Sequence, residues 1–274
     1  MLPSFLLALR EGLEAALIIG IVLGALTKLN RPELKRSVWQ GVSAALGFSL
    51  LAGLVLYLIG AEFEGRAEEI FEGTAMLLAA GILTWMIFWM QRQARTLKSE
   101  LETDVRRAVL HGGQGAVFSL ALLAVGREGL ELALFLIAAG MATTAAQTLV
   151  GALAGLALAI VLGWLFFSST RRLNLRTFFQ VSNVLLVLFA AGLVAHGVHE
   201  FNEAGVIPGI IEHVWDINGI LDEKSVAGSL LTALFGYNGN PSLTEVAAYL
   251  GYFALLPLLG RVLNPAPLPE PAAS

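Results

Sequence analysis

The sequence predicts an all-α integral membrane protein with seven transmembrane helices, in which helices one to three and four to six form an inverted repeat and a seventh helix follows. Three observations support this prediction. The composition is apolar, with 57% hydrophobic and 14% charged residues, far from the balance of soluble domains. The apolar residues gather in segments long enough to span a bilayer. A charged motif inside one segment occurs again in a second segment, which would run in the opposite direction.

Each apolar segment has about the 20 residues that a helix needs to cross the hydrocarbon core. The segments are rich in Gly, Ala and Leu and lack the alternation of polar and apolar residues that barrel strands show. Helices also satisfy their own backbone groups, as the bilayer requires. In chain order, the predicted spans are Leu2–Leu26, Trp39–Ile59, Ile70–Met90, Val117–Met141, Leu149–Phe167, Phe178–His196 and Val246–Leu263.

Basic residues alternate between the loops. The connections after the second, fourth and sixth helices hold only Arg66 and Lys224. The remaining loop cations follow the first, third and fifth helices or end the seventh: Lys28, Arg31, Lys35, Arg36, Arg92, Arg95, Lys98, Arg106, Arg107, Arg171, Arg172, Arg176 and Arg261. Because basic residues concentrate on the cytoplasmic side, we expect the N-terminus outside and the C-terminus in the cytoplasm.

One transmembrane domain is expected over residues 1–263, with a first repeat at about 1–91, a second at about 112–200 and the last helix at about 244–263. A fainter echo supports the repeats, since "LLAAGIL" at Leu77–Leu83 resembles "LFAAGLV" at Leu188–Val194. An odd number of spans in each repeat inverts the second copy, an architecture that carries a midplane site in many transporters. Residues 264–274 are Pro-rich and predicted to be a disordered tail.

The repeated motif places charges inside the membrane. "REGLEAAL" at Arg10–Leu17 returns as "REGLELAL" at Arg127–Leu134, with seven of eight residues identical. Helix rise places both copies about 12–15 Å from the outer boundary, near the middle of the bilayer. Gly12 and Gly129 would let the two motif helices approach each other closely.

The spacing within the motif groups its carboxylates. Positions three apart share a helix face, so Glu11 lies with Glu14 and Glu128 lies with Glu131. Arg10 and Arg127 can each pair with the glutamate four positions later. This pairing leaves Glu11 and Glu128 without an arginine partner.

Two interpretations of the motif are open. Four carboxylates and two arginines leave a net charge of −2 if all are ionised, which a bound cation would neutralise. Oxygen ligands without any cysteine favour hard cations such as Fe(III), Mn, Mg or Ca, and the predicted metal ligands are Glu11, Glu14, Glu128 and Glu131. Alternatively, two Arg–Glu pairs hold the helices together, although this accounts only for Glu14 and Glu131.

Acidic residues gather on the predicted outer side. A negatively charged opening on this side would raise the local concentration of cations. The simpler alternative is a solvated acidic loop. The set comprises Glu62, Glu64, Glu68, Glu69, Glu72, Glu200, Glu203, Glu212, Asp216, Asp222, Glu223 and Glu245.

Some of these residues are candidates for an accessory metal pathway. Glu72 lies near the outer end of the third helix, with Glu68 or Glu69 one turn before it in "EEIFE". "HEFNE" at His199–Glu203 ends the sixth helix and offers His199, Glu200 and Glu203 as ligands; a helix cap with solvated acids is the alternative.

Paired R-E-x-x-E motifs in helices one and four of a seven-helix, N-out protein resemble the high-affinity iron permease family, which includes fungal iron permeases and bacterial EfeU-type iron transporters. The resemblance covers nearly the whole chain, including "HGVHEFNEAGVIP" at His196–Pro208. It implies a permease of the prokaryotic cell membrane that imports iron, as Fe3+ or Fe2+, with no organic cofactor. The glutamates Glu11, Glu14, Glu128 and Glu131 match the family's iron-ligand positions, and Arg10 and Arg127 match its motif arginines.

Other classes of function require other features of the sequence. An intramembrane enzyme would need a nucleophile with a base, or a zinc triad, and neither is visible in the sequence. A transporter of other metal cations such as Mn or Pb, or a glutamate-lined cation channel, stays open as an alternative. The expected partners are iron ions and membrane lipid, not nucleic acid, and any oxidase or periplasmic or extracellular iron-delivery protein would be a separate chain.

Overall fold

A computed structural model describes residues 1–93, 97–141, 144–168, 175–223 and 225–263. All regular secondary structure in these ranges is helical. Seven long helices coincide with the predicted spans: α1 (Leu2–Lys28), α2 (Lys35–Ala61), α3 (Arg66–Gln93), α5 (Gly113–Met141), α6 (Ala145–Ser168), α7 (Leu175–Glu203) and α9 (Leu243–Leu263). Shorter helices are η1 (Pro32–Leu34), α4 (Leu97–His111) and α8 (Val226–Phe235). Of the predicted features, Arg95, Arg171, Arg172, Lys224 and the tail at 264–274 lie outside the described residues.

Five helices are long and apolar enough to cross a membrane, within the part of the chain that the structure describes. They are α2, α3, α6, α7 and α9. The other two long helices, α1 and α5, each carry the three charged residues of the motif within an otherwise apolar stretch. The structure is thus an all-helical membrane protein, and seven spans with the N-terminus outside stay a prediction.

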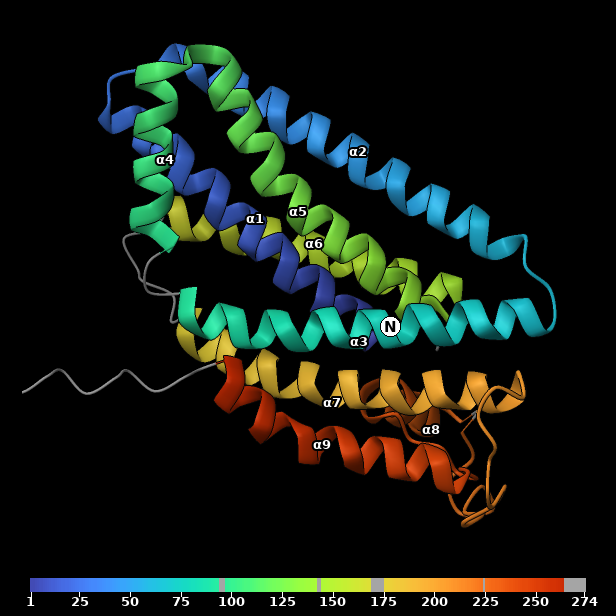
Figure 1. Ribbon diagram of the computed structural model, residues 1–274. Helices are drawn as coiled ribbons and strands as arrows, with labels where there is room; N and C mark the ends of the chain where they lie inside the picture. Colours follow the sequence, from blue (N-terminus) through green and yellow to red (C-terminus); the bar gives the residue numbers. More distant parts are fainter. Residues whose placement is uncertain (94–96, 142–143, 169–174, 224, 264–274) are drawn as a thin grey trace, which may run out of the picture.

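Pairs of long helices organise the fold. Figure 1 shows α3, α7 and α9 side by side in one half of the molecule and α1, α2, α5 and α6 in the other. The most extensive packing joins α1 to α6, α2 to α5 and α3 to α7, and α1 also crosses α5. Exchanging α1, α2 and α3 with α5, α6 and α7 leaves these pairings unchanged, as an inverted repeat would require.

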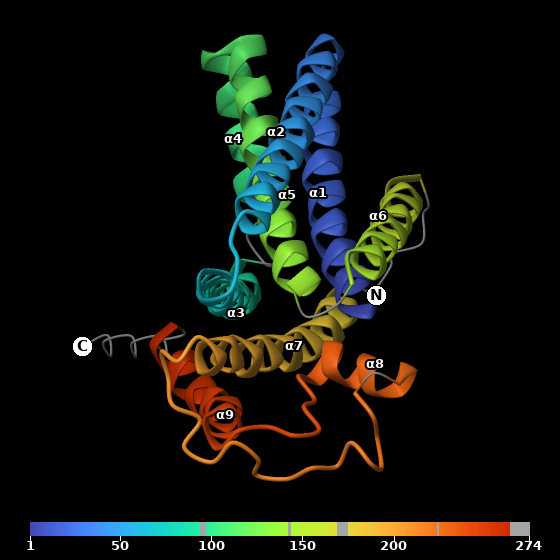
Figure 2. The ribbon, with the colours of Figure 1, turned by 90° about the vertical axis from the view of Figure 1, so that its right-hand side faces the viewer.

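Two apolar cores flank the motifs. One lies among α3, α5, α7 and α9 and contains Met76, Leu83 and Phe135. The other lies among α1, α2, α4 and α5 and contains Val22 and Val38. Figure 2 shows α4 beside α5, at the end of the bundle where α1 turns into α2. There the Lys28 ammonium binds the Glu102 carboxylate of α4 at 2.9 Å.

The motif glycines do not face each other. A Cβ atom on Gly12 would lie 2.7 Å from the Cβ of Ala159 in α6, and one on Gly129 would collide with Ser49 in α2. The expectation that these glycines bring the two motif helices together is therefore wrong. Instead, Gly12 lets α1 pack closely against α6, and Gly129 lets α5 pack closely against α2. In each case the partner is the second long helix of the other repeat.

Gly12→Ala should lower the stability of the folded protein by about 1–3 kcal/mol, because the added methyl overpacks the contact with the side chains of Ala159 and Leu156. Gly24→Ala in the same helix is the matched control, since nothing lies within 4 Å of its added Cβ. Thermal unfolding in detergent compares the two variants. Equal unfolding temperatures would show that α1 and α6 separate without cost.

Candidate metal site

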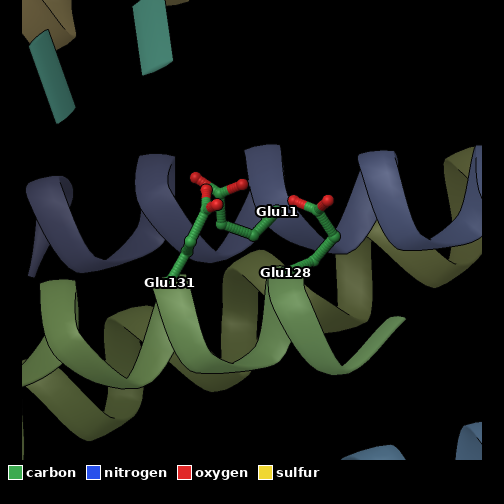
Figure 3. A group of neighbouring side chains, drawn as sticks. All are labelled: Glu11, Glu128 and Glu131. Carbon is green, nitrogen blue, oxygen red and sulfur yellow. The ribbon is translucent and has the colours of Figure 1, made fainter. Parts of the chain in front are cut away.

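The crossing of α1 and α5 brings both motifs together. Glu11 extends from α1, while Glu128 and Glu131 extend from adjacent turns of α5 toward it (Figure 3). One carboxylate oxygen from each of the three residues lies within 4.8 Å of the others. Glu11 and Glu128 are buried, and Glu131 is partly buried. Residues more than a hundred positions apart thus offer three oxygen ligands to one point inside the bundle.

Arg10 is wholly enclosed at this crossing, with 0% of its side chain exposed. Its Nη1 donates to Glu11 Oε1 at 3.0 Å and also lies 3.2 Å from the Sδ of Met86 in α3. Its Nη2 forms the predicted ion pair with Glu14 Oε1 at 3.3 Å. The expectation that Glu11 has no arginine partner is therefore wrong, because the guanidinium lies between both carboxylates of its own motif.

Arg127 is placed differently. Its Nε donates to Glu131 Oε1 at 2.8 Å, which is the predicted pairing four positions apart. The guanidinium lies over the ring of Trp89, with Cζ 4.1 Å from the ring centroid, and 5.9 Å from that of Trp85. The two motifs are thus alike in sequence and unlike in their surroundings.

Each motif glutamate has one buried oxygen without a hydrogen-bond partner among the described residues. These atoms are Glu11 Oε2, Glu14 Oε1, Glu128 Oε2 and Glu131 Oε2. A buried carboxylate oxygen without a partner is costly, and a cation bound by several of them offsets that cost. The donor set consists of oxygens, as hard cations prefer. Glu14 lies outside the converging group of three and is held by Arg10.

The predicted accessory residues lie near the N-terminal end of α3 and the C-terminal end of α7. The two helices cross closely at Gly73 and Gly197, where a Cβ on Gly73 would lie 2.9 Å from the Gly197 carbonyl oxygen and 3.2 Å from the Cβ of Glu200. This crossing brings the turn that carries Glu72 beside Glu200, close enough for the two carboxylates to repel each other. Glu68 is exposed and Glu69 is partly buried.

His199 lies between two carboxylates. Its Nε2 is 3.3 Å from Glu203 Oε1, and its Nδ1 is 3.1 Å from Glu245 Oε1. Within the described part of the chain, the predicted accessory residues do not form a group of three converging ligand atoms like that of the motifs. Their role in a metal pathway stays a prediction.

Sequence reasoning missed the importance of Glu245, which it counted only among the outer acids. The residue is buried, 4% exposed, and its carboxylate accepts hydrogen bonds from Asn238 Nδ2 at 2.7 Å and from the backbone N–H of Ser242 at 3.2 Å. Ser242 Oγ in turn accepts from the Glu245 N–H. "SLTE" before an apolar run is a capping box, and this signal could have predicted the start of α9. The contacts of Met86, Trp85 and Trp89 with the arginines have no comparable signal in the sequence.

Comparisons with known proteins identify the family of the chain. The model of the iron permease FTR1 family matches residues 1–263. The chain is 38% identical over 267 residues to "Ferrous iron permease EfeU" of Escherichia coli O6:H1 (strain CFT073), covering 97% of this chain and 96% of that protein. It is 35% identical over 261 residues to the protein of the same name from Yersinia pestis, covering 94% and 92%.

A further relative, "Putative inactive ferrous iron permease EfeU" of Escherichia coli K12, is 38% identical over 273 residues, covering 96% of this chain and 99% of that protein. No solved structure matches the chain. The matches and the long apolar helices identify a multi-pass protein of a prokaryotic cell membrane, and the chain belongs to the iron permease FTR1 family.

Proposed function

We propose that this chain imports ferrous iron across the cytoplasmic membrane through a site built from Glu11, Glu14, Glu128 and Glu131. The observation that carries the proposal is the convergence of Glu11, Glu128 and Glu131, whose ligand oxygens lie within 4.8 Å of one another in the interior of the bundle. Membership of an iron permease family and the name of the relatives support iron as the substrate.

The size of the oxygen cluster suits a metal ion. A hard divalent cation lies about 2.0–2.6 Å from its oxygen ligands, so ligands on opposite sides of it are separated by about 4–5 Å. The separations in the cluster, which do not exceed 4.8 Å, are compatible with this distance. Arg10, bound to Glu11 and Glu14, lowers the negative charge of the empty site.

Transport then requires access from each side in turn. The proposed seven spans, with the N-terminus outside and two inverted repeats, provide this by moving one set of paired helices against the other around a fixed midplane site. The outer acids Glu62, Glu64, Glu68 and Glu69 would concentrate cations. Glu72, Glu200, His199 and Glu203 would bind iron at the outer ends of α3 and α7 before it descends.

Iron uptake by purified protein in liposomes tests the proposal. We expect accumulation of 55Fe(II) kept reduced with ascorbate, slower uptake of Fe(III), and weaker competition by Mn, Pb and Ca. An excess of unlabelled iron inside the vesicles should accelerate entry of the label, as a carrier predicts and an open channel does not. Vesicles that contain the protein and gain no more iron than empty vesicles would contradict the proposal.

Neutralising the outer acids should separate capture from transfer. The combined change of Glu62, Glu64, Glu68 and Glu69 to Gln removes mainly exposed charge, whose field is screened over about 8 Å at physiological salt. We expect a raised KM with little change in maximal rate, and a difference from wild type that shrinks as ionic strength rises. Glu72→Gln should lower the maximal rate at every salt concentration. The opposite pattern would make the loop acids the obligatory relay.

A further inference from the structure

The two motif arginines differ in what surrounds them. The side chain of Arg10 is 0% exposed, whereas that of Arg127 is 36% exposed. Arg127 is held from two directions, by Glu131 at 2.8 Å and by the face of Trp89 at 4.1 Å. The ring of Trp85 stacks beside that of Trp89, with centroids 6.0 Å apart and planes inclined by 24°.

In this arrangement the Arg127 guanidinium binds one of the two glutamates of its motif and not the other. A tryptophan face attracts a guanidinium more strongly than other aromatic rings do, because its π-system is negative. The guanidinium that lies on Trp89 gives Nε to Glu131. Glu128 Oε2 meanwhile stays buried without a hydrogen-bond partner among the described residues. Among the described residues no aromatic ring lies over Arg10, which binds both glutamates of its own motif.

We infer that Trp89, with Trp85 stacked beside it, is a positioning residue that holds Arg127 on Glu131 and keeps the guanidinium away from the carboxylate of Glu128. The inference rests on the proposed function and adds the residue that sets the affinity of the second motif for iron. Without the ring, the guanidinium is free to pair with Glu128 as well as with Glu131, and it competes with the metal ion for both. With the ring, the guanidinium is held between Trp89 and Glu131, so Glu128 remains open to iron.

The tryptophan pair belongs to one repeat only. The echo that aligns Leu77–Leu83 with Leu188–Val194 places His196 and Glu200 of α7 at the positions of Trp85 and Trp89. An aromatic platform is therefore absent from the corresponding positions of the second repeat. Two nearly identical motifs thereby acquire different roles: on α1 the arginine pairs with both glutamates, whereas on α5 it pairs with Glu131 and leaves Glu128 open.

Substitution of Trp89 tests the inference. Trp89→Leu removes the π-face and should raise the KM for 55Fe(II) uptake by about 2- to 30-fold, the range that cation–π attraction spans between exposed and desolvated sites. The maximal rate should stay within about twofold, because competition by a tethered cation is overcome at high iron. Trp89→Phe keeps a weaker π-face and should give an intermediate KM. Trp39→Leu, at an exposed tryptophan of α2, is the matched control and should behave as wild type.

A double substitution separates positioning from a general structural effect. In an Arg127→Gln background, Trp89→Leu should change the KM no further, because no guanidinium remains to be positioned. Where Arg127→Gln slows uptake below detection, the dissociation constant for 55Fe(II) in detergent gives the same comparison. An unchanged KM in Trp89→Leu, or an equal rise in the presence and absence of Arg127, overturns the inference.

A failure of the proposed function looks different. Wild-type protein that neither binds nor transports iron would contradict the proposed substrate. In that case fluorescence alone tests the contact between Arg127 and Trp89. In a variant with Trp39, Trp164 and Trp215 replaced by Phe, only Trp85 and Trp89 emit. Arg127→Gln should shift that emission, since a cation on the ring face is lost, and an unchanged spectrum overturns the positioning role by itself.

Discussion

Glu128→Gln should abolish iron uptake, with a loss of about 100-fold or more, while the protein folds and inserts normally. The magnitude follows because residues that merely support a metal ligand already contribute 10- to 100-fold, and Glu128 is itself one of the three converging ligands. Stability should be retained or improved, since the substitution removes a buried carboxylate with an unpartnered oxygen and breaks no ion pair to either motif arginine. Uptake of 55Fe(II) and thermal unfolding are measured on the same preparation.

The matched comparison is Glu11→Gln on the facing helix. It also deletes a ligand and should abolish uptake, but it removes the negative charge that Arg10 pairs with at 3.0 Å and should lower the unfolding temperature as well. Glu64→Gln, at an exposed position, controls for the loss of one negative charge. Normal uptake by both Glu128→Gln and Glu11→Gln would contradict the assignment of the site.

Arg10→Gln should destabilise the protein by about 3–5 kcal/mol, the usual result of removing one partner from a buried ion pair. The side chain is fully enclosed, and its loss leaves Glu11 and Glu14 without their cation. Arg127→Gln should cost less, because that side chain is 36% exposed and binds one glutamate. Thermal unfolding without iron, followed in detergent, compares the two arginines.

Compensating substitutions provide the control for Arg10. In the triple variant Arg10→Gln, Glu11→Gln, Glu14→Gln, neutral side chains replace the whole charged group, so most of the lost stability should return while uptake stays absent. If Arg10→Gln and Arg127→Gln unfold at the same temperature as wild type, the buried pairs do not hold the bundle. If the triple variant is no more stable than Arg10→Gln, the stranded carboxylates are not the source of the loss.

The sequence by itself determined the positions of the seven long helices and the local geometry of the motif. Apolar runs of spanning length mark the helices, and the structure has a helix at each of them. The pairing of Arg10 with Glu14 and of Arg127 with Glu131 follows from the period of a single helix and is confirmed. Such features depend on residues a few positions apart, whose relative placement the helix itself dictates.

Contacts between helices needed the tertiary structure. In the structure Arg10 also binds Glu11, and Arg127 lies over the ring of Trp89. Gly12 packs against α6 and Gly129 against α2. A membrane helix is apolar on nearly all sides, so it lacks the single apolar stripe that tells which face of a soluble helix is buried. Two nearly identical motifs therefore acquire different surroundings only when α3 packs beside them, because packing between distant segments depends on shape that the periodicity of one helix does not encode.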